Sequence, residues 1–423
     1  MTLRRFTIAA AVLAIAFGAV ASFWKRETPS RDVTIQFTAG VRGRLVPYGC
    51  FSGKMGGLTR IATLFRSRSA ENVLRFDAGD AIEGPADFQR IGHLAILKAF
   101  AKLDYAATRQ PVFETHRVLK SPGRIAVVGV VDLRGVGDAI GEGLVIEKME
   151  TTLGNLLPKL KAEADFIVLL AFTDEATMHA LAREFYELDV ILGGNVSQPA
   201  QRVERENRSV LLYTANQSCA VGTLAVQFAA PHRVKVREGE VLLVSDQIPK
   251  DQDIRQIADG YRAEIRRTNL DLDDPAKLQS DMIPGVKGGG EFAGTEVCLA
   301  CHAEAARVWR ASHHARAFAT LVTHEADADP NCIGCHTVGF GTPGGYRREY
   351  GVEKLTNVGC ESCHGAGARH VAQRAAGRAD GAGFRTLGAG DCQKCHHGEF
   401  SRPFDFDKFW PLIRHGKEGA SAR

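Results

Sequence analysis

The first half of the chain alternates between short apolar runs rich in β-branched residues and longer segments whose apolar positions follow a helical spacing. The strand-like runs cover residues 33–38, 72–77, 125–131, 166–171, 190–193 and 210–214. The helix-like segments between them cover residues 58–66, 94–103, 151–163 and 175–187. Strands that alternate with helices of this length predict an α/β domain. Two longer runs, 210–228 and 234–244, are more typical of antiparallel strands that close the sheet.

The pattern changes near residue 290. Residues 251–267 predict a polar helix, and the segment that follows contains Pro275, Pro284 and three successive glycines, which is typical of a linker. Beyond it the strand pattern disappears, while glycine, histidine and cysteine become frequent. We therefore expect an α/β domain over residues 33–248, a helix and linker over 249–292, and a mainly α domain over 293–423.

The N-terminus has the pattern of an export element. Two arginines precede an uncharged, apolar stretch at residues 6–24, which is long for a signal-peptide core and near the lower limit for a membrane span. An Ala-Val-Ala sequence at residues 19–21 suits cleavage, and the two basic residues that follow suit a retained anchor. Residues 1–26 are therefore predicted to be either a signal peptide or an N-terminal membrane anchor. Both would deliver the rest of the chain to the periplasm or another extracytoplasmic space.

Charge adds little, because a formal net charge of +4 over 423 residues gives no reason to expect a nucleic-acid partner. Cysteine is informative, because eight of the ten cysteines fall in four copies of Cys-x-x-Cys-His. The copies are Cys298, Cys301 and His302; Cys332, Cys335 and His336; Cys360, Cys363 and His364; and Cys392, Cys395 and His396. This spacing is the attachment signature of c-type haem. On a helical turn, residues three and four apart share a face, so both thiols can add to the haem vinyl groups while the histidine points at the iron.

Zinc sites and disulfides fit the motif less well than haem does. Zinc ribbons and disulfide frameworks both use paired cysteines, but neither requires a histidine at the fifth position every time. We therefore expect four covalently bound haem c groups. The segment after residue 290 is rich in glycine and poor in long apolar runs, so it would be a haem-packed domain whose folding depends on haem attachment.

Each iron has one further axial position. The sequence contains no methionine after Met282, so His/Met ligation is not available within this domain. Six histidines outside the motifs remain as candidate distal ligands: His313, His314, His324, His370, His397 and His415.

Three segments make a specific resemblance. The first is Trp309-x-x-Ser312-x-His314-Ala315-x-Ala317; the second runs from Cys332 to Gly339, and the third from Val358 to Gly365. Together they resemble the cytochrome c-554 family of tetrahaem proteins. In that family the first, third and fourth haems have two histidine ligands, and the second is five-coordinate with an open distal face.

The resemblance implies particular distal ligands. It implies that His314 caps an iron whose proximal histidine comes from a later motif, and that His370 and His415 are the other two distal ligands. His324 is the candidate if the second haem, at His336, has a sixth ligand. His313 and His397 adjoin ligands and are expected to lie beside them or in solvent.

The α/β domain resembles the metallophosphoesterase domain of 5'-nucleotidases in four short segments, at residues 43–45, 56–58, 77–80 and 191–194. The resemblance implies a sandwich fold with a two-metal site. At the family's ligand positions, however, this chain has Arg42, Phe172 and Asn195 instead of histidines, and only Asp80 remains of the ligand set. One carboxylate cannot hold two ions, so we expect a degenerate domain, a pseudoenzyme without phosphoesterase activity. The alternative is that a different set of residues binds one metal ion.

These features favour electron transfer between periplasmic redox partner proteins. An alternative is the reduction or oxidation of a small nitrogen species (nitric oxide, nitrite or hydroxylamine) at the His336 haem, if that haem is five-coordinate. A weaker one is that the α/β domain binds a nucleotide or phosphorylated ligand. Cys50 and Cys219 lie outside the haem motifs, and in an oxidising compartment they form either a disulfide or two separate buried thiols.

Overall fold

The computed structural model describes residues 31–47, 55–68, 72–82, 84, 86–108, 116–120, 123–132, 147–214, 218–268, 291–348, 353–378, 387–397 and 404–416. The predicted export element, Cys50 and most of the predicted linker lie outside these ranges, so the signal or anchor and the disulfide stay predictions. Within the described ranges, no helix combines the length and apolar character needed to cross a membrane.

The α/β part contains two sheets. The five-stranded sheet has the order β11-β10-β1-β2-β3, and the six-stranded sheet has the order β4-β5-β6-β7-β9-β8. The strands are β1 (Arg31–Thr38), β2 (Val73–Asp77), β3 (Tyr105–Thr108), β4 (His116–Leu119), β5 (Ile125–Val131), β6 (Phe166–Phe172), β7 (Val190–Gly194), β8 (Glu204–Glu206), β9 (Ser209–Tyr213), β10 (Ala220–Ala230) and β11 (Arg233–Leu243). The helices of this part are α2 (Leu58–Ser67), α3 (Asp87–Lys102), α4 (Met149–Glu163), α5 (Glu175–Glu184) and α6 (Gln252–Arg267).

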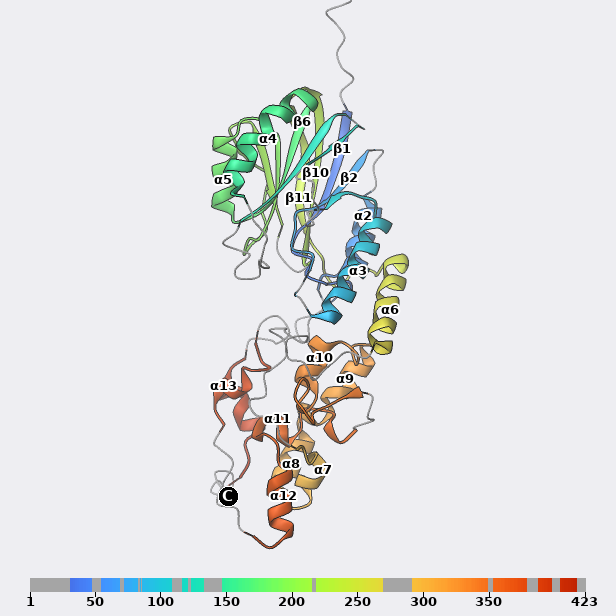
Figure 1. Ribbon diagram of the computed structural model, residues 1–423, viewed down its shortest axis with the longest axis vertical. Coiled ribbons are helices and arrows are strands. Elements are labelled where there is room, and N and C mark those ends of the chain that lie inside the picture. Colours follow the sequence, from blue (N-terminus) through green and yellow to red (C-terminus); the bar gives the residue numbers. More distant parts are fainter. Residues whose placement is uncertain are drawn as a thin grey trace, which may run out of the picture.

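The two sheets pack face to face between helices. Phe37 of β1 and Leu169 of β6 belong to one buried cluster that spans both sheets. Strands β5, β6, β7 and β9 run parallel, and every residue of β6 is buried, as expected for a strand covered on both sides. Helices α4 and α5 cover the outer face of the six-stranded sheet, and α2, α3 and α6 pack together beside the other (Figure 1). The predicted α/β sandwich is confirmed.

The run at residues 210–228 differs from its predicted arrangement. Strand β9 pairs in parallel with β7 in one sheet, whereas β10 pairs antiparallel with β1 and β11 in the other. Only β10 and β11 therefore form the predicted antiparallel closure. Apolar periodicity indicates that a strand is buried, but it does not indicate which of two stacked sheets the strand joins.

The C-terminal part consists of short helices, as predicted. They are α7 (Thr295–Leu299), α8 (Ala303–Ala311), α9 (Ala317–Thr323), α10 (Pro330–His336), α11 (Cys360–His364), α12 (Ala368–Ala375), α13 (Ala389–Cys392) and α14 (Phe406–Phe409), with 3₁₀ turns η4 (His313–Arg316), η6 (Glu353–Leu355) and η8 (Trp410–Leu412). Its small apolar cluster includes Ile333, Val338 and Phe340, and it also contains Phe88 and Ile265 from α3 and α6. The two parts of the chain therefore share one buried cluster.

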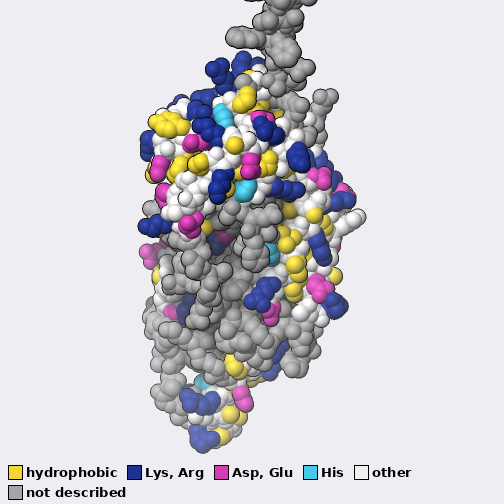
Figure 2. Space-filling model, turned by 45° about the horizontal axis from the view of Figure 1, so that its top comes forward, with side chains coloured by type: hydrophobic (Ala, Val, Ile, Leu, Met, Phe, Trp, Pro, Cys, Tyr) yellow, Lys and Arg dark blue, Asp and Glu magenta, His cyan; other side chains and the backbone are white. Residues whose placement is uncertain are grey.

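The surface charge is mixed. On the face shown in Figure 2, the described Lys and Arg side chains over the α/β part are interspersed with acidic side chains. This face therefore presents no patch of a single sign among its described residues, which agrees with the small net charge.

Candidate functional site

A large cavity runs through the C-terminal part. Its volume is about 2250 Å³, and residues of all four Cys-x-x-Cys-His motifs line it. A pocket for one drug-sized ligand measures about 300–1,000 Å³. The cavity thus has room for several large groups, and the Cys and His side chains that line it are the donors that haem c requires.

The four motifs lie in two neighbouring pairs. The thiol of Cys298 in the first motif lies beside that of Cys360 in the third, and their interaction is the main cause of the raised pKa of Cys298. The thiols of Cys395 and Cys335, in the fourth and second motifs, interact in the same way. Burial raises the pKa of Cys363 to about 11, so the thiol of this cysteine is protonated at neutral pH. The fold therefore brings together motifs that are far apart in the sequence.

Three of the motif histidines face a histidine from elsewhere in the chain. The ring centroids are 6.2 Å apart for His302 and His370, 6.1 Å for His314 and His396, and 5.9 Å for His364 and His415. A histidine nitrogen binds a metal at about 2 Å, and the ring centroid lies about 1 Å further away, so two rings on opposite sides of one iron should be roughly 6 Å apart. The residues present therefore fit three irons that each have two histidine ligands.

The pairing agrees with the ligand set that the resemblance implies. His314 faces His396 of the fourth motif, and the expectation was that it faces a histidine of a later motif, without saying which one. Burial, followed by the neighbouring histidine His396, lowers the pKa of His314 to about 4, so its ring is neutral at pH 7, as a ligand must be. The Nδ1 of His415 donates to the carbonyl of Ile413 at 2.9 Å, which leaves Nε2 as the ligating nitrogen. The ligand roles themselves stay predictions.

His336 is different. Its Nδ1 donates to the carbonyl of Ala317 at 2.7 Å, which orients the ring and leaves Nε2 to bind an iron. Burial lowers the pKa of His336, so the ring is neutral. Among the described residues, no second imidazole forms a ring pair with it. His324 lines the same cavity but is exposed, and His313 is also exposed.

Local hydrogen bonds explain the Trp-x-x-Ser-x-His sequence. The Nε1 of Trp309 donates to the carbonyl of Val358 at 2.8 Å, and the hydroxyl of Ser312 donates to the carbonyl of Trp309 at 2.7 Å. The amide of Val358 donates to the carbonyl of His314 at 3.3 Å. These bonds attach the His314 turn to the segment just before the third motif, and thereby fix the position of the distal histidine.

Sequence reasoning missed Glu361, which occupies a variable position inside the third motif. Its side chain is buried, and its carboxylate accepts hydrogen bonds from the amides of Ala293 at 2.9 Å, Gly294 at 2.8 Å and Gly367 at 2.7 Å. Glu361 therefore joins the start of the C-terminal part to the third motif. No pattern in the sequence separates this glutamate from the exposed acidic residues around it.

In the α/β part, the position of the family's two-metal site does not fit two metal ions. Asp80 is the remaining carboxylate, and Nε of Arg42 lies 3.5 Å from its Oδ2. The resemblance implies a histidine ligand at the position of Arg42, whose guanidinium lies beside this carboxylate. Asp77 is buried and accepts the hydroxyl of Thr38 at 2.7 Å and the amide of Gly79 at 3.1 Å.

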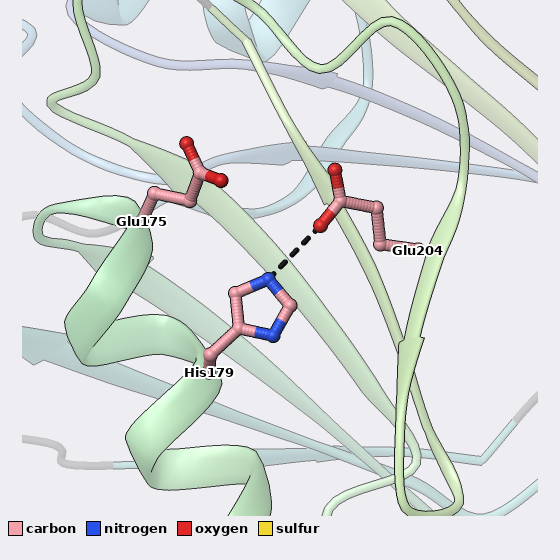
Figure 3. A group of neighbouring side chains, drawn as sticks. All are labelled: Glu175, His179 and Glu204. Atoms are coloured by element: carbon pink, nitrogen blue, oxygen red, sulfur yellow. Dashed lines mark hydrogen bonds and ion pairs between the residues drawn. The ribbon is translucent and has the colours of Figure 1, made fainter.

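A second group of metal-type donors lies on α5 and β8, outside this position (Figure 3). The donor atoms of Glu175, His179 and Glu204 lie within 4.8 Å of one another. Nε2 of His179 is 2.9 Å from Glu204, and Nδ1 is 3.0 Å from Glu206, which also pairs with Arg183. Contacts between the His179 ring and two glutamates account for this geometry without a metal ion.

The four motifs, the cavity that they line and the three histidine pairs are the features of the class of multihaem c-type cytochromes. Residues 297–365 match the family described as cytochrome c554 and c-prime. Cytochrome c-554 of Nitrosomonas europaea is 40% identical over 91 residues, which are 18% of this chain and 39% of that protein. This chain thus spans about two fifths of the curated relative that it matches, and the resemblance to cytochrome c-554 is confirmed over that segment.

The α/β part is similar to phosphoesterases. A 5'-nucleotidase precursor from Thermus thermophilus superposes with a TM-score of 0.47 and 19% identity, over 56% of this chain and 59% of that one. A calcineurin-like phosphoesterase from Bacillus subtilis gives a TM-score of 0.43 and 16% identity, over 56% of this chain and 98% of that one.

Proposed function

We propose that this protein transfers electrons between periplasmic redox partner proteins through four covalently bound haem c groups. The observation that carries the proposal is the set of three histidine pairs, each about 6 Å apart, around one cavity that all four motifs line. Haem, when bound, supplies reversible one-electron chemistry. Two imidazole ligands without methionine favour low potentials.

The residues of the chain have separate tasks in this proposal. The eight motif cysteines tether the haems, and the motif histidines hold the irons on the proximal side. His370, His314 and His415 close the opposite sides of the sites of His302, His396 and His364. Because Cys298 touches Cys360 and Cys335 touches Cys395, the haems of each motif pair would lie side by side, which suits electron hopping between them.

The proposal is tested on protein produced with its export signal in a host that attaches haem c. Intact mass should show four added haems, and a redox titration should resolve four one-electron steps at low potentials. A colourless product or a mass without haem would end the proposal. The variant Cys301→Ala serves as an internal control, because it should weaken attachment at the first motif alone.

A second function is favoured by one observation, namely that His336 has no imidazole partner among the described residues. We propose as the alternative that a small nitrogen species, such as nitric oxide, nitrite or hydroxylamine, binds and reacts at this site. The ferrous protein should then have one high-spin haem whose spectrum shifts when nitric oxide is added. Four low-spin haems that do not respond to nitric oxide would exclude this function.

For the α/β domain we propose a fold retained without hydrolase chemistry. The Arg42–Asp80 ion pair supports this, because the guanidinium lies beside the one carboxylate that remains of the family's ligand set. The domain would be exported together with the cytochrome part by the element at residues 1–26.

A further inference from the structure

We propose that the α/β domain forms one wall of the compartment around His336, and that Arg44 binds a propionate carboxylate of the haem carried there. This inference rests on the proposed function, because it requires a haem at the second motif. It gives the α/β domain a task other than phosphate-ester hydrolysis, namely shaping the surroundings of one particular haem.

The α/β domain itself lines the cavity that the four motifs share. Arg44, Phe88, Gln89 and Tyr261 all face the same cavity as the cysteines and histidines of the four motifs. They come from the loop before α2, from the first turn of α3, and from α6. The wall of the cavity is therefore built from both parts of the chain.

This wall lies beside the second motif. Phe88 of α3 and Ile265 of α6 belong to the same buried cluster as Ile333, which lies between the two cysteines of the second motif. In Figure 1, α9 and α10 lie at the end of the C-terminal part that faces α3 and α6, whereas α12 lies at the far end.

Two ion pairs hold the parts together at the same place. Arg262 reaches Glu325 at 2.7 Å, and Arg266 reaches Asp327 at 2.8 Å, both in the segment that joins α9 to α10. These pairs are partly exposed and contribute little energy, but they fix how α6 lies on the second-motif region.

Arg44 is a charged residue of this wall. It is 9% exposed and lines the cavity, so its charge is largely withdrawn from water, and a guanidinium in such a place is suited to bidentate binding of a carboxylate. Its backbone is held by α2, because the amide of Leu58 donates to the carbonyl of Arg44 at 3.0 Å. A Cβ at Gly57, where φ is 88°, would lie 2.5 Å from the backbone of Val46 and Pro47, so the loop packs closely on the start of α2.

The test is a redox titration of the haem-loaded full chain with each of four variants. A positive charge near a haem favours its reduced form, so Arg44→Gln should lower the potential of one haem and leave the other three unchanged. Arg44→Lys should restore most of the shift. Arg60→Gln is the matched control, because Arg60 is equally buried in α2 but does not line the cavity, and all four potentials should stay at their wild-type values.

A further variant covers the case in which Arg44→Gln does not fold. Arg262 also lines the cavity, and its side chain is 18% exposed, so Arg262→Gln should fold and shift the same haem in the same direction by a smaller amount. Potentials that do not move in any foldable variant would overturn the inference. An equal shift of all four haems would also overturn it.

The outcomes separate this inference from the proposed function. The number of haems per chain is measured by mass on every sample before the titration. Fewer than four haems in the wild type would contradict the proposed function. Four haems with unchanged potentials in the variants would contradict only the inference about the α/β domain and Arg44. Resonance Raman spectra provide an independent measure, because the bending band of one propionate should move in Arg44→Gln and stay in place in Arg60→Gln.

Discussion

Substitution of Glu361 should lower the stability of the C-terminal part strongly without changing a predicted haem ligand. Its Oε1 accepts the amides of Ala293 and Gly367, and its Oε2 accepts the amide of Gly294, all within 2.7–2.9 Å. The side chain is 3% exposed, so no water replaces these bonds when the carboxylate is lost.

The magnitude follows from the three bonds. Hydrogen bonds to a charged group contribute about 1.5–3 kcal/mol each, and a buried donor left without a partner costs about 1–3 kcal/mol. In Glu361→Gln the remaining carbonyl oxygen still accepts the amides of Ala293 and Gly367, but as a neutral acceptor. The new NH₂ group faces the amide of Gly294, and because both groups are donors, that hydrogen bond is lost. We expect Glu361→Gln to cost about 3 kcal/mol, and Glu361→Ala about 4 kcal/mol or more, of the free energy of unfolding.

The assay is guanidinium unfolding of haem-loaded protein, followed by the Soret band for the cytochrome part and by far-UV circular dichroism for the whole chain. Two transitions are expected, so the comparison rests on the Soret midpoint. Glu304→Gln is the matched control, since Glu304 pairs with Arg307 on the exposed face of α8 and should contribute less than about 0.5 kcal/mol. If Glu361→Gln stays within about 1 kcal/mol of the wild type, the three bonds do not hold this region together.

Three further outcomes are expected. His370→Ala should keep four covalent haems but convert one from low-spin to high-spin, as seen by electron paramagnetic resonance, whereas His313→Ala should change nothing because its ring is exposed and pairs with no motif histidine in the described residues. The hydrogen bond from Arg124 lowers the pKa of Asp165, so that carboxylate stabilises the fold above the ordinary carboxyl pKa, and the contribution is lost as pH falls through the lowered value. Asp165→Asn should therefore lose up to about 1 kcal/mol at pH 7 in urea unfolding, and the difference from the wild type should vanish in strong acid; a difference that is equal at both pH values would contradict the assignment. Finally, added manganese should give no phosphodiesterase activity with the wild type, and measurable turnover of a chromogenic phosphodiester would show that the Arg42–Asp80 pair does not block the site.

The sequence predicts most of the α/β strands because their burial is uniform. Residues 125–131 and 166–171 are unbroken apolar runs, and β5 and β6 lie at these positions. It does not predict β4 or β8, whose four and three residues are half-exposed or polar and are strands only because longer neighbours pair with them. It also gives no sign that β9 and β10 lie in different sheets, because pairing depends on contacts between distant segments.

In the predicted haem region, too, the sequence shows local features but does not show contacts between distant segments. Each Cys-x-x-Cys-His motif is contained in five residues, so the sequence shows it directly. Which distal histidine faces which proximal one depends on the fold, and the structure pairs His302 with His370 although 68 residues separate them. The role of Glu361 is also invisible in the sequence, because its three partners are backbone amides, which any residue other than proline supplies.

The two parts of the chain share one buried cluster, so the order in which they fold depends on which part forms its core first. The α/β domain has its own core in two sheets, and no residue of the four Cys-x-x-Cys-His motifs belongs to it. The cytochrome part has only a small apolar cluster, and Phe88 and Ile265 of the α/β domain complete it. If haem supplies most of the core of this region, as we propose, Ile333 and Val338 do not take fixed positions before the haems are attached. We therefore expect that haem attachment comes first and that docking of α3 and α6 against the second motif follows, so a chain that lacks the second haem should also lack the contacts between its two parts.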